Sequence, residues 1–231
     1  MTHMTSAGRH FQAGIDELKR ELALQGTTVS GRLVKALRAL ATRDLHALDE
    51  VAIGDAEINA RQMSIDDRAF KLLALQQPVA IDLRVIVAAI KVNADLERIG
   101  DLAVNIAESS RRYIDYGAIS DEELIPRMAE VAETMLHWGI EAFVTGNVGV
   151  AQTVLERDDV LDTLRDQAFR RLADTMAKVP ACVRSALELM LLTRHLERIG
   201  DHSTNIAEDA FFVVAGEDVR HHAHGLSASA E

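Results

Sequence analysis

Long amphipathic stretches separated by short turns run along the whole chain. Apolar residues recur three and four positions apart, as on one face of a helix, and no run of residues alternates like a strand. This spacing predicts six long helices. They are expected at residues 7–42, 44–76, from about 78 past 108, 126–145, after an N-cap at Asn147 through 176, and 180–215. The stretch QGTTVSG at 25–31 predicts a bend or break in the first helix, because glycine and β-branched residues disfavour helix.

Short connections between these helices require neighbours to pack antiparallel. The predicted fold class is therefore all-α, with two three-helix bundles in tandem. The first bundle is expected at residues 7–115, the second at 120–215, and a flexible histidine-containing tail at 216–231. The apolar stripes predict these core residues: Leu83, Ile86, Ile90 and Ile106 in the first bundle, and Val183, Leu187, Met190 and Ile206 in the second.

One polar segment occurs twice, one hundred residues apart. Residues 94–110 read ADLERIGDLAVNIAESS, and residues 194–210 read RHLERIGDHSTNIAEDA, with ten of 17 aligned positions identical. His195 and His202 flank only the second copy, so these two histidines are not part of the shared design. The duplication favours two structural units with one chemical feature in common.

Each copy carries two carboxylates four residues apart, Glu97 with Asp101 and Glu197 with Asp201. On a helix such a pair lies on one face with its Cβ atoms about 6 Å apart. Like charges at this spacing repel one another unless a cation lies beside them. The duplicated pair therefore predicts two cation sites, against the alternative of solvated helix faces.

The preceding helix of each half carries a second set of oxygen-bearing side chains, Asp55 with Asn59 and Asp158 with Asp162, offset by 103 residues. Two antiparallel helices can place both sets across one groove, where carboxylate and amide oxygens suit hard metal ions. Further candidates on or beside the same stripes are Asn105, Glu108, Asn205, Glu208, Arg98 and Arg198.

Gly100 and Gly200 lie in the middle of predicted helices, where glycine costs about 1 kcal/mol relative to alanine. Two explanations remain open. A loop, helix or ligand could need close access to the backbone at each site, or neighbouring helices could simply pack tightly there.

Charge and composition argue against several classes of function. A net charge of −11 argues against nucleic-acid binding, which needs clustered Lys and Arg. The single cysteine, Cys182, and the lack of a signal peptide or membrane span predict a soluble cytoplasmic protein. No nucleotide-binding loop, H-E-x-x-H or serine or cysteine triad signature is present, so no enzymatic activity is expected. A carboxylate-metal-dependent hydrolase or oxidase is the alternative, and a purely structural repeat protein is a third.

The chain resembles the PhoU family of bacterial phosphate-transport accessory and regulatory proteins over nearly its whole length, from about His10 to Ala215. The two LERIGD…NIAE segments and the upstream acidic pairs carry the resemblance. It implies metal binding, in some members as multinuclear clusters, by these residues: Asp55, Asn59, Glu97, Asp101, Asp158, Asp162, Glu197 and Asp201. Asn59 departs from the family's carboxylate, which implies weaker binding at the first site.

The resemblance also implies a function. The family's proteins are negative regulators of phosphate uptake and of phosphate-starvation signalling, and they link the ATPase subunit of the phosphate ABC transporter to a sensor histidine kinase. We therefore expect a homodimeric adaptor that binds iron, magnesium, manganese or zinc and meets the membrane only through its partners.

Overall fold

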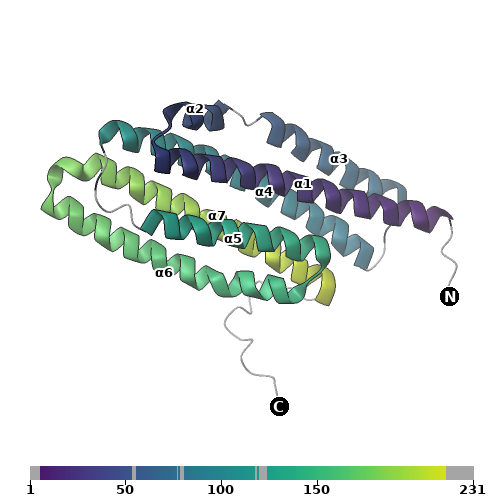
Figure 1. The fold of residues 1–231 in the computed structure, drawn as a ribbon. Helices are drawn as coiled ribbons and strands as arrows, with labels where there is room; N and C mark the ends of the chain where they lie inside the picture. Colours follow the sequence, from purple (N-terminus) through teal and green to yellow (C-terminus); the bar gives the residue numbers. More distant parts are fainter. Residues whose placement is uncertain are drawn as a thin grey trace, which may run out of the picture.

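Six helices of at least 21 residues lie side by side in the computed structural model (Figure 1). They are α1 Ser6–Thr42, α3 Ala56–Gln76, α4 Ile81–Tyr116, α5 Leu124–Thr145, α6 Val148–Lys178 and α7 Val183–Ala215. A short α2, Leu45–Ile53, and a 3₁₀ turn, Pro180–Cys182, complete the described elements. The structure describes residues 6–53, 56–76, 78, 81–117, 119 and 124–216, and none of these forms a strand. The predicted all-α fold with six long helices is confirmed.

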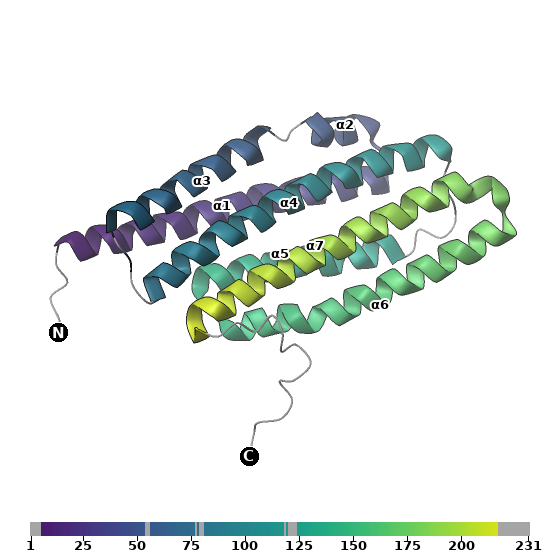
Figure 2. The same ribbon diagram turned by 180° about the vertical axis from the view of Figure 1, so that it is seen from behind.

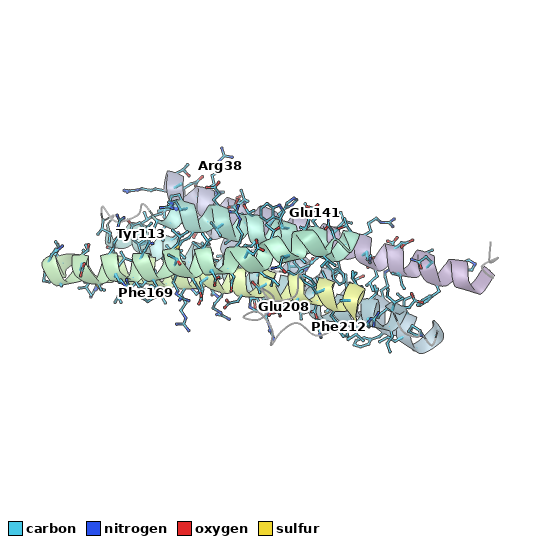
Figure 3. All side chains as sticks on the ribbon, turned by 90° about the horizontal axis from the view of Figure 1, so that it is seen from below. Arg38, Tyr113, Glu141, Phe169, Glu208 and Phe212 are labelled. Carbon is cyan, nitrogen blue, oxygen red and sulfur yellow. The ribbon has the colours of Figure 1, made fainter. Side chains whose placement is uncertain are left out.

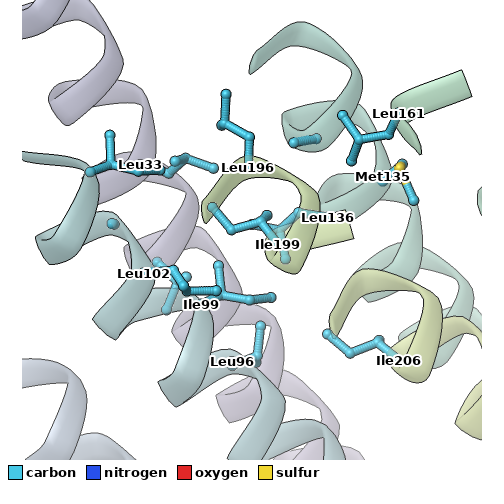
Figure 4. Close-up of a cluster of buried hydrophobic side chains, with 14 of the residues drawn as sticks. Leu33, Leu96, Ile99, Leu102, Met135, Leu136, Leu161, Leu196, Ile199 and Ile206 are labelled. Atoms are coloured by element: carbon cyan, nitrogen blue, oxygen red, sulfur yellow. The ribbon is translucent and has the colours of Figure 1, made fainter. Parts of the chain in front are cut away.

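The first four helices lie on one side of the molecule and the last three on the other, with α4 and α7 as central neighbours (Figure 2). One continuous core nevertheless joins the two sides. Figure 4 shows Leu33 of α1 and Leu102 of α4 in the same cluster as Leu136 of α5 and Leu196 of α7. The division into units at 7–115 and 120–215 remains a prediction, and the predicted tail from 217 onward lies outside the described residues.

Several predicted helix ends agree with the structure. The Asn147 side chain caps α6 by accepting hydrogen bonds from the backbone N of Gly149 at 3.0 Å and of Val150 at 3.2 Å. Pro126 lies in the first turn of α5, where its missing N–H costs nothing. Gly216 ends α7 in the left-handed conformation, with φ 76°.

Two helix predictions were wrong. The single helix expected at 44–76 is two helices, α2 and α3, and the sequence between them, Gly54-Asp55, consists of weak helix formers. The break expected at 25–31 is absent, because α1 is continuous through this stretch. A Cβ atom on Gly26 would lie 2.4 Å from Cδ1 of Ile140, so close packing of α5 on α1 needs the glycine that seemed to weaken the helix.

The predicted core was correct only in part, and Ile90, Val183 and Met190 are half-buried. Ile86, Ile106 and Ile206 are fully buried, whereas Leu83 is 41% exposed and Leu187 is 49% exposed. Leu83 lies on α4 and Leu187 on α7. The apolar period alone did not distinguish these two helix faces.

Helices α4 and α7 run antiparallel (Figure 2). Polar side chains join them, and each contact includes a buried carboxylate. The contacts are Lys91 with Asp209 at 2.9 Å, Arg112 with Glu188 at 2.9 Å, and His202 Nδ1 with Asp95 Oδ1 at 2.8 Å. The residue numbers of the first two pairs each add to 300. Because the repeat offset is one hundred, α4 and α7 meet as equivalent helices related by an approximate two-fold axis.

Among the described helices, none has the length and apolar character needed to cross a membrane.

Candidate metal sites

The second acidic motif lies where α7 packs closely on α6. A Cβ atom on Gly200 would lie 2.4 Å from Cδ2 of Leu161 and 3.7 Å from Oδ1 of Asp158. The glycine therefore lets α7 approach the α6 side chains. Of the two explanations for this glycine, tight helix packing accounts for its position.

Four carboxylates influence one another where α6 meets α7, and we call this cluster the second groove: Asp158, Asp162, Glu197 and Asp201. Burial, followed by the charges of Asp162 and Asp201, raises the pKa of Asp158 to about 6. Burial, followed by the charges of Glu197 and Asp162, also raises the pKa of Asp201. The structure thus brings together all four residues that the sequence assigns to this site. Their mutual repulsion is only partly relieved within the chain.

The guanidinium of Arg165 provides a positive charge beside these carboxylates. Its guanidinium pairs with Glu197, with Asp162 at 2.9 Å and with Asp166 at 3.0 Å. Sequence analysis did not assign Arg165 to the site, although it lies three residues after Asp162 and therefore on the same helix face. That spacing is the signal that could have identified it.

The polar stripe on α7 does not continue along α6 as expected. Thr204, which the sequence analysis also missed, donates to Asp158 Oδ1 at 3.4 Å. Asn205 instead turns toward α4, where its amide donates to Asp95 Oδ1 at 3.4 Å. Glu208 is half-buried one turn further on, and Figure 3 places it on the same side of the molecule as Phe212.

The first acidic motif packs on α3 as the second packs on α6. A Cβ atom on Gly100 would lie 3.0 Å from Cδ1 of Ile58 on α3, the residue aligned with Leu161. Glu97 is half-buried and Asp101 exposed, as are their counterparts Glu197 and Asp201, whereas Asn59 is exposed where Asp162 is half-buried. Asp55, the fourth residue of the predicted set, lies outside the described residues.

The remaining candidates have other neighbours. Arg98 lines a hollow of about 320 Å³ between α4 and α7, together with Asp95 and Lys91. Arg198 is exposed beside His195, and burial, followed by the charges of Arg198 and other arginines, lowers the pKa of that histidine. Glu108 is 3.8 Å from Arg112, one turn along α4, and Asn105 is half-buried.

Among the residues that the structure describes, no three Asp, Glu, His or Cys side chains are arranged so that they could hold a metal ion. In the second groove, two of the carboxylates bind Arg165 instead. The donor set is nevertheless all-oxygen and repulsive, which suits a hard cation. Glu197, Asp201, Asp158 and Asp162 are the residues that would hold it, in competition with Arg165.

These features define a class: an all-helical tandem-repeat protein with an acidic motif at the same place on the central helix of each half. A sequence profile described as the PhoU domain matches residues 22–110 and again residues 125–210. The chain belongs to the PhoU family. This is a family of accessory and regulatory proteins and not of enzymes, in agreement with the sequence prediction, so the hydrolase or oxidase alternative has no support.

Individual PhoU proteins are similar to this chain along most of their length. A "phosphate-specific transport system accessory protein PhoU homolog" of Caulobacter vibrioides is 34% identical over 203 residues, which cover 87% of this chain and 88% of the relative. The crystal structure of PhoU from Pseudomonas aeruginosa superposes with a TM-score of 0.86 at 30% identity, over 90% of this chain and 100% of that one. The PhoU structure from Streptococcus pneumoniae gives 0.85 at 26% identity, over 90% and 99%.

Proposed function

We propose that this protein is an accessory regulator of phosphate-specific transport. Relatives that match most of this chain are described as phosphate-specific transport system accessory proteins, and the match covers most of their own length. In finer detail, the protein lowers phosphate uptake and silences the phosphate-starvation response when phosphate is plentiful. It does so as a cytoplasmic homodimer that links the transporter's ATPase subunit to a sensor histidine kinase.

A metal ion bound in each acidic groove is part of this proposal. The observation that carries it is the second groove, where burial and neighbouring carboxylates raise the pKa of Asp158 and of Asp201. A hard cation such as Mg²⁺, Mn²⁺ or iron would relieve that repulsion, and more than one ion could share the four carboxylates. Zinc is a weaker candidate because the groove offers no nitrogen or sulfur ligand among the residues assigned to it.

Metal content per chain tests the metal sites directly. Elemental analysis would compare the wild type with Glu97→Gln/Asp101→Asn and with Glu197→Gln/Asp201→Asn, after incubation with Mg²⁺, Mn²⁺ and iron. We expect each double variant to lose about half of the metal while its helical circular dichroism is unchanged. Glu141→Gln/Glu156→Gln, which removes the same charge outside the grooves, is the control and retains all of it. A wild type that binds no metal would contradict this part of the proposal.

The regulatory role needs a cellular test. In a strain that lacks this protein, we expect phosphate uptake and a phosphate-starvation reporter to stay high in phosphate-rich medium. The wild-type chain restores repression, and pull-down from its membranes recovers the transporter ATPase and the kinase. If the reporter and uptake are unchanged in the deletion strain, the protein is not such a regulator. A purely structural repeat protein predicts that outcome together with wild-type behaviour of both groove variants.

A further inference from the structure

A largely apolar hollow of about 420 Å³ opens where the C-terminal part of α1 meets the N-terminal part of α5. It lies at the end of the molecule where Figure 3 labels Arg38 of α1 and Tyr113 of α4. Its apolar wall combines both halves of the protein: Leu37, Leu40, Tyr113, Ile125, Ala129 and Leu189. The volume is in the range of ligand pockets, which occur preferentially between structural units.

Two carboxylates, those of Glu130 and Glu133, complete the wall from α5. Within the described part of the chain, neither has an ion-pair partner. Glu133 is half-buried, and its burial, followed by the charge of Glu130, raises its pKa. A carboxylate that is partly desolvated and not compensated costs folding free energy, so a cation supplied from outside would be favoured there.

The same two helices pack closely further along their interface. There Ile140 of α5 packs on Gly26 of α1, so closely that a Cβ atom on the glycine would lie 2.4 Å from the isoleucine. Lys19 Nζ also donates to the backbone oxygen of Val144 at 3.3 Å across this part of the interface. The hollow is therefore not a general consequence of how α1 crosses α5.

We propose that this hollow is the docking site for a basic amphipathic segment of a partner protein. The segment places aliphatic side chains against Leu37, Leu40 and Ile125, and a lysine or arginine beside Glu130 and Glu133. Charge complementarity selects this occupant. An uncharged apolar ligand would bury Glu133 further without a counter-ion, an anion would be repelled, and the net charge of −11 attracts basic partners over a longer range.

This site is separate from the acidic grooves. Tyr113 follows Asp101 by twelve residues on α4, which corresponds to about 18 Å along the helix. Docking here does not depend on metal binding, so the proposal goes beyond the metal-bound adaptor and is tested independently of it.

The test measures binding of a fluorescein-labelled, amidated peptide of lysine and leucine in amphipathic helical register, about 14 residues long. Fluorescence anisotropy at physiological salt compares the wild type with Glu130→Gln/Glu133→Gln and with Ala41→Trp, which adds an aromatic ring at the exposed rim of the hollow. We expect both variants to weaken binding about tenfold. The control Glu141→Gln/Glu156→Gln removes the same charge elsewhere, and Glu141 lies further along α5 (Figure 3), so it weakens binding no more than about twofold.

Other results would overturn the proposal. Equal weakening by both charge variants means that the peptide binds the acidic surface without a specific site. Equally tight binding of a peptide with glutamate in place of lysine would rule out recognition of positive charge. Equally tight binding of a peptide with serine in place of leucine would rule out recognition of an apolar helix face. If Ala41→Trp changes the mass of the assembly in sedimentation, the hollow holds a second copy of this chain. If native mass spectrometry finds a co-purified small molecule that Ala41→Trp removes, the hollow holds that compound.

Discussion

The two acidic motifs have the same sequence but differ in how their charge is balanced. The first site, as the sequence defines it, has three carboxylates and the amide of Asn59, and the position aligned with Arg165 is Gln62. The second has four carboxylates and the guanidinium of Arg165. The formal charge is therefore −3 at each. Two differences with opposite effects on charge, Asn59 in place of Asp162 and Gln62 in place of Arg165, therefore leave the formal charge of the two aligned sets equal.

Removing that counter-ion has the largest expected effect. In metal-free protein, Arg165→Gln leaves Glu197 and Asp162 without their cation in a partly buried groove, and we expect it to lower the free energy of unfolding by about 2 kcal/mol. Because a metal ion no longer competes with the guanidinium, affinity for Mn²⁺ should rise about tenfold, as measured by titration calorimetry. Arg170→Gln, an exposed position on the same helix, is the control. Unchanged affinity in Arg165→Gln would mean that Arg165 does not compete with metal.

The glycines provide the next comparison. Gly200→Ala pushes a methyl group against Leu161, and we expect a net loss of about 1 kcal/mol after the gain in helix propensity. Gly100→Ala meets Ile58 at a longer distance and should change stability by no more than about 0.5 kcal/mol. Urea denaturation of both variants measures the difference. Equal stability would show that the closer approach of α7 to α6 is not energetically significant.

The pH dependence of stability tests the carboxylate cluster. Asp158 binds its proton more tightly in the folded protein, where its pKa is about 6, than in the unfolded chain, where it is near 3.8. Stability is therefore favoured below pH 4 and falls as pH rises toward 6. With a chelator present, Asp158→Asn should be more stable than the wild type by about 1 kcal/mol at pH 7.5, since screening reduces the effect at a half-buried site.

At pH 4 the same variant should match the wild type, because Asp158 is then mostly protonated in the folded state. The exposed neighbour provides a matched control in Asp159→Asn, which should show no such pH-dependent gain. A constant difference between Asp158→Asn and the wild type across this pH range would mean that packing, and not charge, produces it.

The smallest effect is expected from making the first site resemble the second. Asn59→Asp adds a carboxylate at an exposed position and should destabilise metal-free protein by about 0.5 kcal/mol. Adding Gln62→Arg should restore the stability that Asn59→Asp removes. A double-mutant cycle on unfolding free energies measures the coupling between the two positions. Strict additivity would show that Gln62 and Asn59 are not equivalent to Arg165 and Asp162.

Periodicity and duplication predicted the long helices, apart from the division of 44–76 and the continuity of α1, and the proximity of four carboxylates on α6 and α7. The six long helices follow from residue spacing, and the α6–α7 groove follows from two i, i+4 pairs on antiparallel neighbours. The prediction that Leu83 and Leu187 are buried was wrong, because amphipathic spacing cannot distinguish a helix face covered by another helix from one open to solvent. Metal binding at either groove is still a prediction.

Contacts between distant parts of the chain were beyond the reach of sequence reasoning. His202 seemed unrelated to the repeat, yet it is bonded to Asp95, which is 107 residues away. The apparent weak point at Gly26 is a packing requirement set by Ile140. In both cases the partner lies in the other half of the chain, and no local pattern identifies it.

A chain with two similar halves could in principle pair each central helix with its own counterpart in another molecule. In the observed arrangement Arg112 faces Glu188 and Lys91 faces Asp209. Two copies of α7 packed in the equivalent register would instead place Glu188 opposite Phe212 and Asp209 opposite Leu191. Buried charges without partners cost about 3–5 kcal/mol each. The unequal polar contacts thus favour pairing of α4 with α7 and act against pairing of two copies of α7 from different chains.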